Sequence, residues 1–305
     1  MSKILLTNTL ALFLIITANC QTQTDPRSEV EKYYAEAAAG RGYSLPKGTL
    51  KEVSAKYLLE VSETKLKSEN AKIRYAAIDL LSRKGRLMNP GKERYPFVIL
   101  LTQAVSDPDG GNNGAALRGL RQFTSSDFNK EAKEKIVARL RVNTMRKDEL
   151  IKIAGFAGCT NATALIRTAF IDNTSEKKKV QWAAHLALAR MGDTASFNYC
   201  LARIKSEPPS DNVVWYLFPD LVYTKNPEGI RYMLDQVLSD EKKCSSPNPS
   251  KEVKIICAFK VMEVVAPAIK NFPLPVDDGD LEIDNYDEAL AKVRDWINTN
   301  PQLII

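Results

Sequence analysis

The sequence predicts an all-α protein in which about six helix pairs stack into an α-α superhelix. Helix-forming Ala, Leu, Lys and Glu dominate the composition, and the 14 glycines and 15 prolines are too few for a loop-rich β protein. In addition, one helical pattern of apolar residues recurs along the chain. Apolar residues make up 44% and charged residues 26% of the 305 positions, which is normal for a folded protein.

The clearest copy of the recurring pattern begins at Val180. Apolar residues follow it at spacings of three and four, and Gly192 stands where a left-handed cap would end the helix. A second apolar line, which runs on the roughly opposite side of this helix, consists of Trp182, Leu186 and Ala189. A helix that is apolar on two faces is packed on both sides, as in the middle of a stack.

The same register predicts the first helix of each pair. Gly85, Gly158 and Asn226 take the place of the cap in three further copies. First helices are expected at 73–85, 116–123, 150–158, 180–192, 214–226 and 253–264. Second helices are expected at 95–110, 129–141, 162–172, 195–207 and 227–241, after tight turns. A helix at 27–40 and another at 286–299 would cap the two ends of the stack.

Three stretches carry a resemblance to the HEAT-repeat family: SDPD at 106–109, IRYAA at 73–77 and ARMGD at 189–193. The resemblance covers about residues 50 to 270, while Pro219 and an irregular insertion in the sixth unit depart from the pattern. It implies a HEAT-like solenoid over 49–305 with an irregular C-terminal cap. It also implies a binding scaffold whose second helices line a concave face.

The first segment has the features of an export signal. Lys3 precedes an apolar stretch that ends at Ala18 and is shorter than the roughly 20 residues of a membrane-spanning helix. Residues 16–20, Ile-Thr-Ala-Asn-Cys, resemble a bacterial lipobox. The resemblance implies a signal peptide at 1–19 and, over 20–48, a lipidated Cys20, a polar tether and the N-terminal helix. Cleavage before Gln21 without lipid and an uncleaved anchor are the alternatives.

Four cysteines remain after Cys20: Cys159, Cys200, Cys244 and Cys257. An even number in an exported protein suggests disulfides. A bridge between Cys244 and Cys257 is favoured, because it would join the end of one helix pair to the next helix. A bridge between Cys159 and Cys200 is less compatible with the helix register, and four buried thiols are the remaining alternative.

Basic residues are concentrated in the middle of the chain. Ten lie between Arg118 and Lys152, against five acids, and three lysines follow at 177–179. Lys130, Lys133 and Arg141 are the candidate partner-binding residues of this region, and they would suit an acidic or polyanionic partner. The alternative is an ordinary helix surface, since glutamates are interleaved at i,i+4 spacing.

The sequence contains no catalytic or cofactor motif. His185 is the single histidine, so the usual metal and nucleophile arrangements that need a second one are excluded. The acidic run at 277–288 does not match a calcium loop and is interpreted as a solvated loop. The net charge of +6 is mild for this length and does not indicate nucleic-acid binding.

These observations lead to one functional expectation. The chain is expected to be a non-enzymatic, lipid-anchored, HEAT-like scaffold of the bacterial envelope, at the outer membrane or the periplasmic face, that binds a protein partner. It would touch the membrane through its N-terminal lipid, and it would need no metal and no cofactor. A surface-exposed adhesin or ligand-binding lipoprotein is the alternative.

Overall fold

The computed structural model describes residues 25–142, 144–247, 253–277 and 279–300, and these are mostly helical, as predicted. The signal peptide expected at 1–19, Cys20 and the tether residues 21–24 lie outside them. The α-helices in chain order are α1 (Pro26–Ala38), α2 (Thr49–Glu52), α3 (Ala55–Lys65), α4 (Ala71–Leu87), α5 (Tyr95–Ala104), α6 (Gly110–Leu120), α7 (Lys130–Leu140), α8 (Lys147–Ala157), α9 (Thr163–Ile166), α10 (Lys178–Arg190), α11 (Thr194–Lys205), α12 (Phe218–Thr224), α13 (Pro227–Val237), α14 (Ala258–Val265) and α15 (Tyr286–Thr299). No helix in these ranges has both the length and the apolar character needed to cross a bilayer.

Side-chain caps explain where many of the helices begin. The residue before the first turn accepts a hydrogen bond from a backbone N–H group of that turn, which stabilises a helix start by about 1 kcal/mol. Asparagine and aspartate take this role at Asp25, Asn70, Asp109, Asn129, Asp193, Asn226 and Asn285.

The left-handed helix ends are only partly as predicted. Gly158 and Gly192 do have positive φ angles, of 69° and 95°. Gly85 does not end its helix, because α4 continues to Leu87; a Cβ at Gly85 would lie 2.7 Å from the ring of Phe123, so the glycine serves close packing instead. Asn226 caps the start of α13, and the left-handed position before it is Lys225, with φ of 53°.

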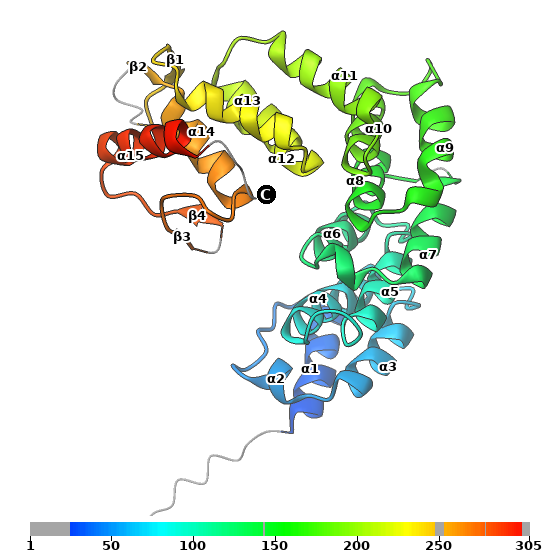
Figure 1. Ribbon diagram of the computed structural model, residues 1–305. Coiled ribbons are helices and arrows are strands. Elements are labelled where there is room, and N and C mark those ends of the chain that lie inside the picture. Colours follow the sequence, from blue (N-terminus) through cyan, green and yellow to red (C-terminus); the bar gives the residue numbers. More distant parts are fainter. Residues whose placement is uncertain (1–24, 143, 248–252, 278, 301–305) are drawn as a thin grey trace, which may run out of the picture.

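The helices form a curved row with two layers (Figure 1). On the inner side of the bend lie α4, α6, α8, α10 and α12, and each contacts the next. On the outer side lie α3, α5, α7 and α9. Of the second helices that were expected to line a concave face, α5, α7 and α9 therefore lie on the outer side, and for these three the expectation is wrong. The reason is α3, which the sequence analysis did not include: it packs on α4, so each outer helix precedes its inner partner instead of following it.

The buried apolar residues form two clusters that meet at α10. Val180, Ala184 and Leu188 of α10 belong to the cluster that extends back to α1, whereas Ala189 belongs to the one that extends to α15. Trp182 packs against the second cluster. The prediction that this helix is packed on two faces is thus confirmed.

The helix expected at 214–226 is divided by its proline. A π-helical segment, η4 (Val213–Leu217), leads into α12, in which Pro219 occupies the first turn. This position suits proline because its missing N–H group has no partner in the first turn of a helix anyway. A second π-helical segment, η3 (Arg167–Ile171), extends α9, and short 3-10 turns are η1 (Ser125–Asp127), η2 (Thr160–Ala162) and η5 (Ala266–Ala268).

The C-terminal region departs most from the prediction. The helix expected at 253–264 begins only at Ala258, because residues before it form strand β2 (Lys254–Ile256), antiparallel to β1 (Lys242–Ser245). A second antiparallel strand pair, β3 (Val276–Asp277) with β4 (Asp280–Leu281), overlaps the acidic run at 277–288 that was interpreted as a loop. Cys244 and Cys257 form the disulfide that the sequence favoured, 13 residues apart. Cys159 and Cys200 are buried free thiols, so no bridge joins them.

Candidate functional site

The three basic residues singled out on α7 do not form a compact patch. Lys130 and Arg141 are eleven residues apart, which corresponds to about 16 Å along a helix. Lys130 lies 3.9 Å from Glu134 on the same helix, and Lys135 lies 3.5 Å from Glu131. Lys133 is only half-exposed between them. Lys130 and Lys135 thus have glutamate partners within the helix, whereas Lys133 and Arg141 form no ion pair among the described residues. The role of this surface in partner binding stays a prediction.

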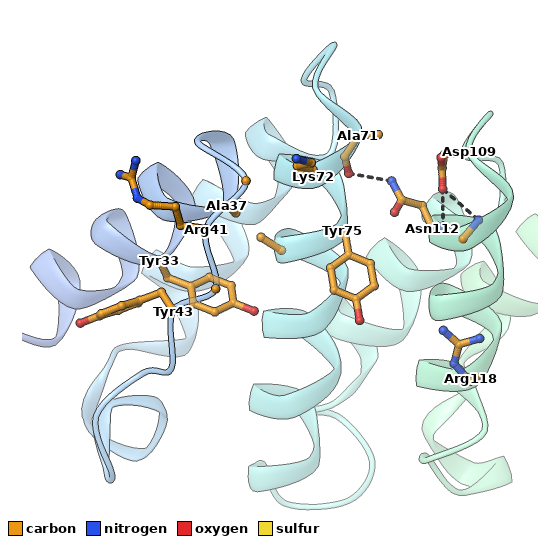
Figure 2. A pocket seen from close by; sticks show the side chains of 14 residues that line it. Tyr33, Ala37, Arg41, Tyr43, Ala71, Lys72, Tyr75, Asp109, Asn112 and Arg118 are labelled. Carbon is orange, nitrogen blue, oxygen red and sulfur yellow. Dashed lines mark hydrogen bonds between the residues drawn. The ribbon is translucent and has the colours of Figure 1, made fainter.

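A groove with a stronger positive character opens at the N-terminal end of the inner layer. Its volume is about 540 Å³, and it lies over α1, the loop that follows α1, α4 and the start of α6 (Figure 2). We call it the α1–α4–α6 groove. Three tyrosines and three cations line it: Tyr33, Tyr43 and Tyr75, with Arg41, Lys72 and Arg118.

Local structure sets the position of each of these side chains. Lys72 and Tyr75 are one turn apart in α4, and neither belongs to the buried stripe of that helix. Lys72 lies beside Gly40, whose φ is 72°, and a Cβ at that glycine would meet the Lys72 ammonium group. Arg118 extends from α6 toward the same space (Figure 2).

Hydrogen bonds hold the walls of the groove in place. Tyr33 of α1 donates to Asp79 of α4 at 2.8 Å, and Asn112 of α6 donates to the carbonyl of Ala71 at 2.9 Å. Burial and the neighbouring Asp79 carboxylate raise the pKa of Tyr33, so this phenol stays protonated and serves as a donor. The three helices that form the groove are therefore connected to each other by polar contacts as well as by apolar packing.

An ion pair at the rim of this region adds to the connection. Arg74 of α4 donates to both carboxylate oxygens of Asp107, at 2.7 and 2.9 Å, and both side chains are almost fully buried. Burial by itself raises the pKa of Asp107, but hydrogen bonds from Arg74, from the Asp109 backbone and from Asn112 bring it below its ordinary value. Asp107 therefore stays ionised at neutral pH.

The cations of the groove differ in whether a carboxylate already neutralises them. Arg41 forms an ion pair with Glu36. Among the residues that the structure describes, Lys72 and Arg118 form no ion pair, and both are exposed. Asp109 is the single carboxylate that lines the groove, and it accepts hydrogen bonds from the backbone N–H groups of Gly111 and Asn112. The groove consequently presents two cations without an ion pair and one capping carboxylate, beside the exposed ring of Tyr75.

The groove continues along the seam between α4 and α6. A smaller hollow of about 170 Å³ shares Tyr75 and Arg118 with it, and Ala115 and Gly119 form part of its floor. The two hollows together make an elongated surface rather than a single closed cavity. Such a surface can hold an anionic group and an apolar body side by side.

Among the described residues, neither a cluster of potential metal ligands nor the histidine lines the groove. No group of three potential metal ligands occurs in the part of the chain that the structure describes. His185 lies elsewhere, stacked on Tyr199 at a centroid distance of 4.0 Å, and burial together with Arg167 lowers its pKa. Its ring is partly buried against neighbouring side chains.

Sequence reasoning missed the groove because its parts are distant in the chain. Arg118 was counted within the basic middle, but Arg41, Lys72 and Tyr75 were not recognised as its companions. One local signal was present: Tyr75 is a large aromatic residue beside the buried stripe of its helix, and 48% of it is exposed. The chain matches no protein-family model, no curated protein and no solved structure.

Proposed function

We propose that this chain is a non-enzymatic, lipid-anchored, HEAT-like repeat protein of a bacterial envelope that acts as a protein-binding scaffold. The observation that carries this proposal is the packing order of the helices. The hairpins α3–α4, α5–α6 and α7–α8 each pack on the neighbouring unit, and the inner helices contact one another in sequence from α4 to α12. Arrays with this kind of packing expose long continuous surfaces, which suits the binding of other chains.

The anchor part of the proposal rests on the sequence alone. The first described helix begins at Pro26, five residues after Gln21, so a lipid on Cys20 would hold the folded part within about 20 Å of the bilayer. Several acyl chains on one cysteine make such anchoring stable, because each buried CH₂ group contributes about 0.8 kcal/mol.

Metabolic labelling with a radioactive fatty acid tests the anchor. We expect the full-length chain to take up label in a bacterial host, and the Cys20→Ala variant to lose it. Cys200→Ala is the matched control, because this thiol is buried in the fold and should leave labelling unchanged. A mature chain that begins at Gln21 without label would contradict lipid anchoring and leave the scaffold proposal standing.

Site-specific photo-crosslinking in cells tests the scaffold. A crosslinking residue at position 75 lines the α1–α4–α6 groove, whereas one at position 130 is at the start of α7, a helix of the outer layer. We expect a discrete crosslinked product from position 75 and a weaker or absent one from position 130. Crosslinked products from position 130 alone would support partner binding by Lys130, Lys133 and Arg141. The absence of a product from both positions would contradict the scaffold.

A further inference from the structure

We propose that the α1–α4–α6 groove binds an extended acidic peptide segment, with Lys72 and Arg118 pairing with its carboxylates and the Tyr75 ring packing against its chain. This inference rests on the proposed scaffold function and names the class of partner. The sequence suggested that cations on α7 bind the partner. The cations of the proposed site lie instead in the α1–α4–α6 groove, on the inner side of the row.

Charge is the first argument. Some cations of this protein have a carboxylate partner within the same helix or on a neighbouring one, as Lys130, Arg83 and Arg121 do. Lys72 and Arg118 form no ion pair among the described residues, and they line the same hollow. The planar guanidinium of Arg118 can form two parallel hydrogen bonds to a single carboxylate, and the ammonium of Lys72 suits a second one. Pairing in a partly enclosed groove is also less screened than pairing on an open surface.

Shape is the second argument, and it separates an extended chain from a compact anion. The main hollow of about 540 Å³ lies within the range of ordinary ligand sites. Tyr75 and Arg118 also line the hollow along the α4–α6 seam. An elongated surface of this kind suits a chain that runs along it better than a compact anion. A peptide segment with carboxylates a few residues apart can reach Lys72 and Arg118 together while it follows the groove.

Preorganisation is the third argument. The hydrogen bonds Tyr33–Asp79 and Asn112–Ala71 fix the helices that carry the binding groups. Tyr75 can offer a large rigid surface for little loss of conformational entropy. On the protein's side, the cost of ordering is therefore restricted mainly to the Lys72 and Arg118 side chains, which favours measurable binding of a short segment.

Fluorescence anisotropy with a defined probe tests the inference. The purified full-length protein is titrated into dye-labelled Glu-Glu-Tyr-Glu-Glu, and Gln-Gln-Tyr-Gln-Gln serves as the neutral control. We expect saturable binding of the acidic peptide, weakened as salt is raised, and about tenfold or weaker binding of the neutral one. Lys72→Glu and Arg118→Glu should each reduce the affinity for the acidic peptide by about tenfold or more.

Matched controls on the outer layer separate a site from a general charge effect. Lys130→Glu and Arg141→Glu change the net charge by the same amount, and we expect them to leave the affinity within about twofold, since neither residue lines the groove or the adjoining hollow. Circular dichroism checks that every variant is folded, and Lys72→Gln with Arg118→Gln provides a milder second pair. An equal loss from the outer variants would overturn the site.

Two further outcomes overturn the inference without touching the scaffold itself. One is the absence of saturable peptide binding to the unmodified protein while position 75 still crosslinks to a partner in cells. The other is binding of phosphatidylglycerol vesicles, dependent on Lys72 and Arg118, by a protein that ignores the peptide; this would assign the groove to a lipid surface.

Discussion

Between α4 and α7, neighbouring segments are joined by buried ion pairs, whereas between α13 and α14 they are joined by a disulfide. Arg74 with Asp107 and Arg94 with Asp127 connect the N-terminal units. In the C-terminal region, Cys244 and Cys257 connect the β1–β2 hairpin to the start of α14. Both devices hold a connecting loop against the helices, but one depends on ionisation and the other on oxidation.

The comparison shows how the two ends of the row can respond to different conditions. Asp127 is fully buried, and it accepts hydrogen bonds from Gly91, Thr124 and Arg94. The N-terminal units thus depend on a carboxylate whose partners come from two different loops. The C-terminal region contains short strands and irregular segments, and a covalent bond limits the freedom of its longest connection.

The largest expected effect is the loss of the buried carboxylate. Asp127→Ala leaves Arg94 and two backbone N–H groups without their partner, and we expect a destabilisation of about 3–5 kcal/mol. Denaturant unfolding measures the total, and hydrogen exchange should place the loss in α5 to α7. Glu134→Ala is the control, because its pair with Lys130 is exposed and contributes under about 0.5 kcal/mol. Equal effects of the two variants would contradict a special role for Asp127.

The second effect belongs to the other region. Replacing both Cys244 and Cys257 with serine should cost about 3 kcal/mol, since a closed loop of this length restricts the unfolded chain by that amount. Increased hydrogen exchange is expected in α14 and α15 and not in α4 to α7. A reducing agent should reproduce this pattern in the unmodified protein and have no effect on the double variant. Exchange that rises equally in both regions would show that the row unfolds as one unit.

The third effect separates the two devices by pH. The pKa values of Asp107 and Asp127 are lowered: burial raises each of them, but hydrogen bonds from arginine and backbone donors outweigh it. A lowered folded-state pKa contributes stability above the unfolded value of about 3.9, and this contribution is lost as the pH falls through the folded-state value. The pKa of Asp211, which pairs with Lys260 of α14, is lowered as well, but this carboxylate is partly exposed whereas Asp127 is fully buried. We therefore expect acid to loosen α4 to α7 before α14. If α4 to α7 and α14 loosen at the same pH in Asp127→Asn, protonation of this buried carboxylate is the cause of the difference in the unmodified protein. Loosening of α14 first in the unmodified protein would contradict this explanation.

The sequence predicted best those helices whose own residues show a clear apolar stripe or a capping residue. The stripe around Val180 and the capping residues determined most inner helices to within a few residues. Helix α3 was missed because it buries few residues: Leu58, and Ser62, whose hydroxyl lies 3.0 Å from that of Tyr34. A short polar helix of this kind is fixed by its neighbours, and its own periodicity is weak.

The candidate site and the small strands could not be predicted from the sequence, because both depend on contacts between separate segments of the chain. Residues 254–256 are extended because β1 pairs with them, while their apolar pattern with Val253 is equally compatible with a helix. The α1–α4–α6 groove combines segments around positions 40, 75 and 115, and their proximity depends on how α1 and α6 pack on α4. The sequence identified the cations of the protein, but it could not show which of them lack a partner.

The smallest expected effect on stability concerns the groove itself. Lys72 and Arg118 are exposed and form no ion pair among the described residues, so their replacement by glutamate should change the free energy of unfolding by no more than about 0.5 kcal/mol. Denaturant midpoints of the two variants, compared with those of Asp127→Ala, measure this directly. The contrast matters because residues kept for stability are buried and paired in this protein, whereas Lys72 and Arg118 have neither property. A loss of stability above about 2 kcal/mol in both variants would mean that the two cations help to hold α4 and α6 in the fold. Their positive charge would then be explained by stability, and it would no longer point to an acidic ligand.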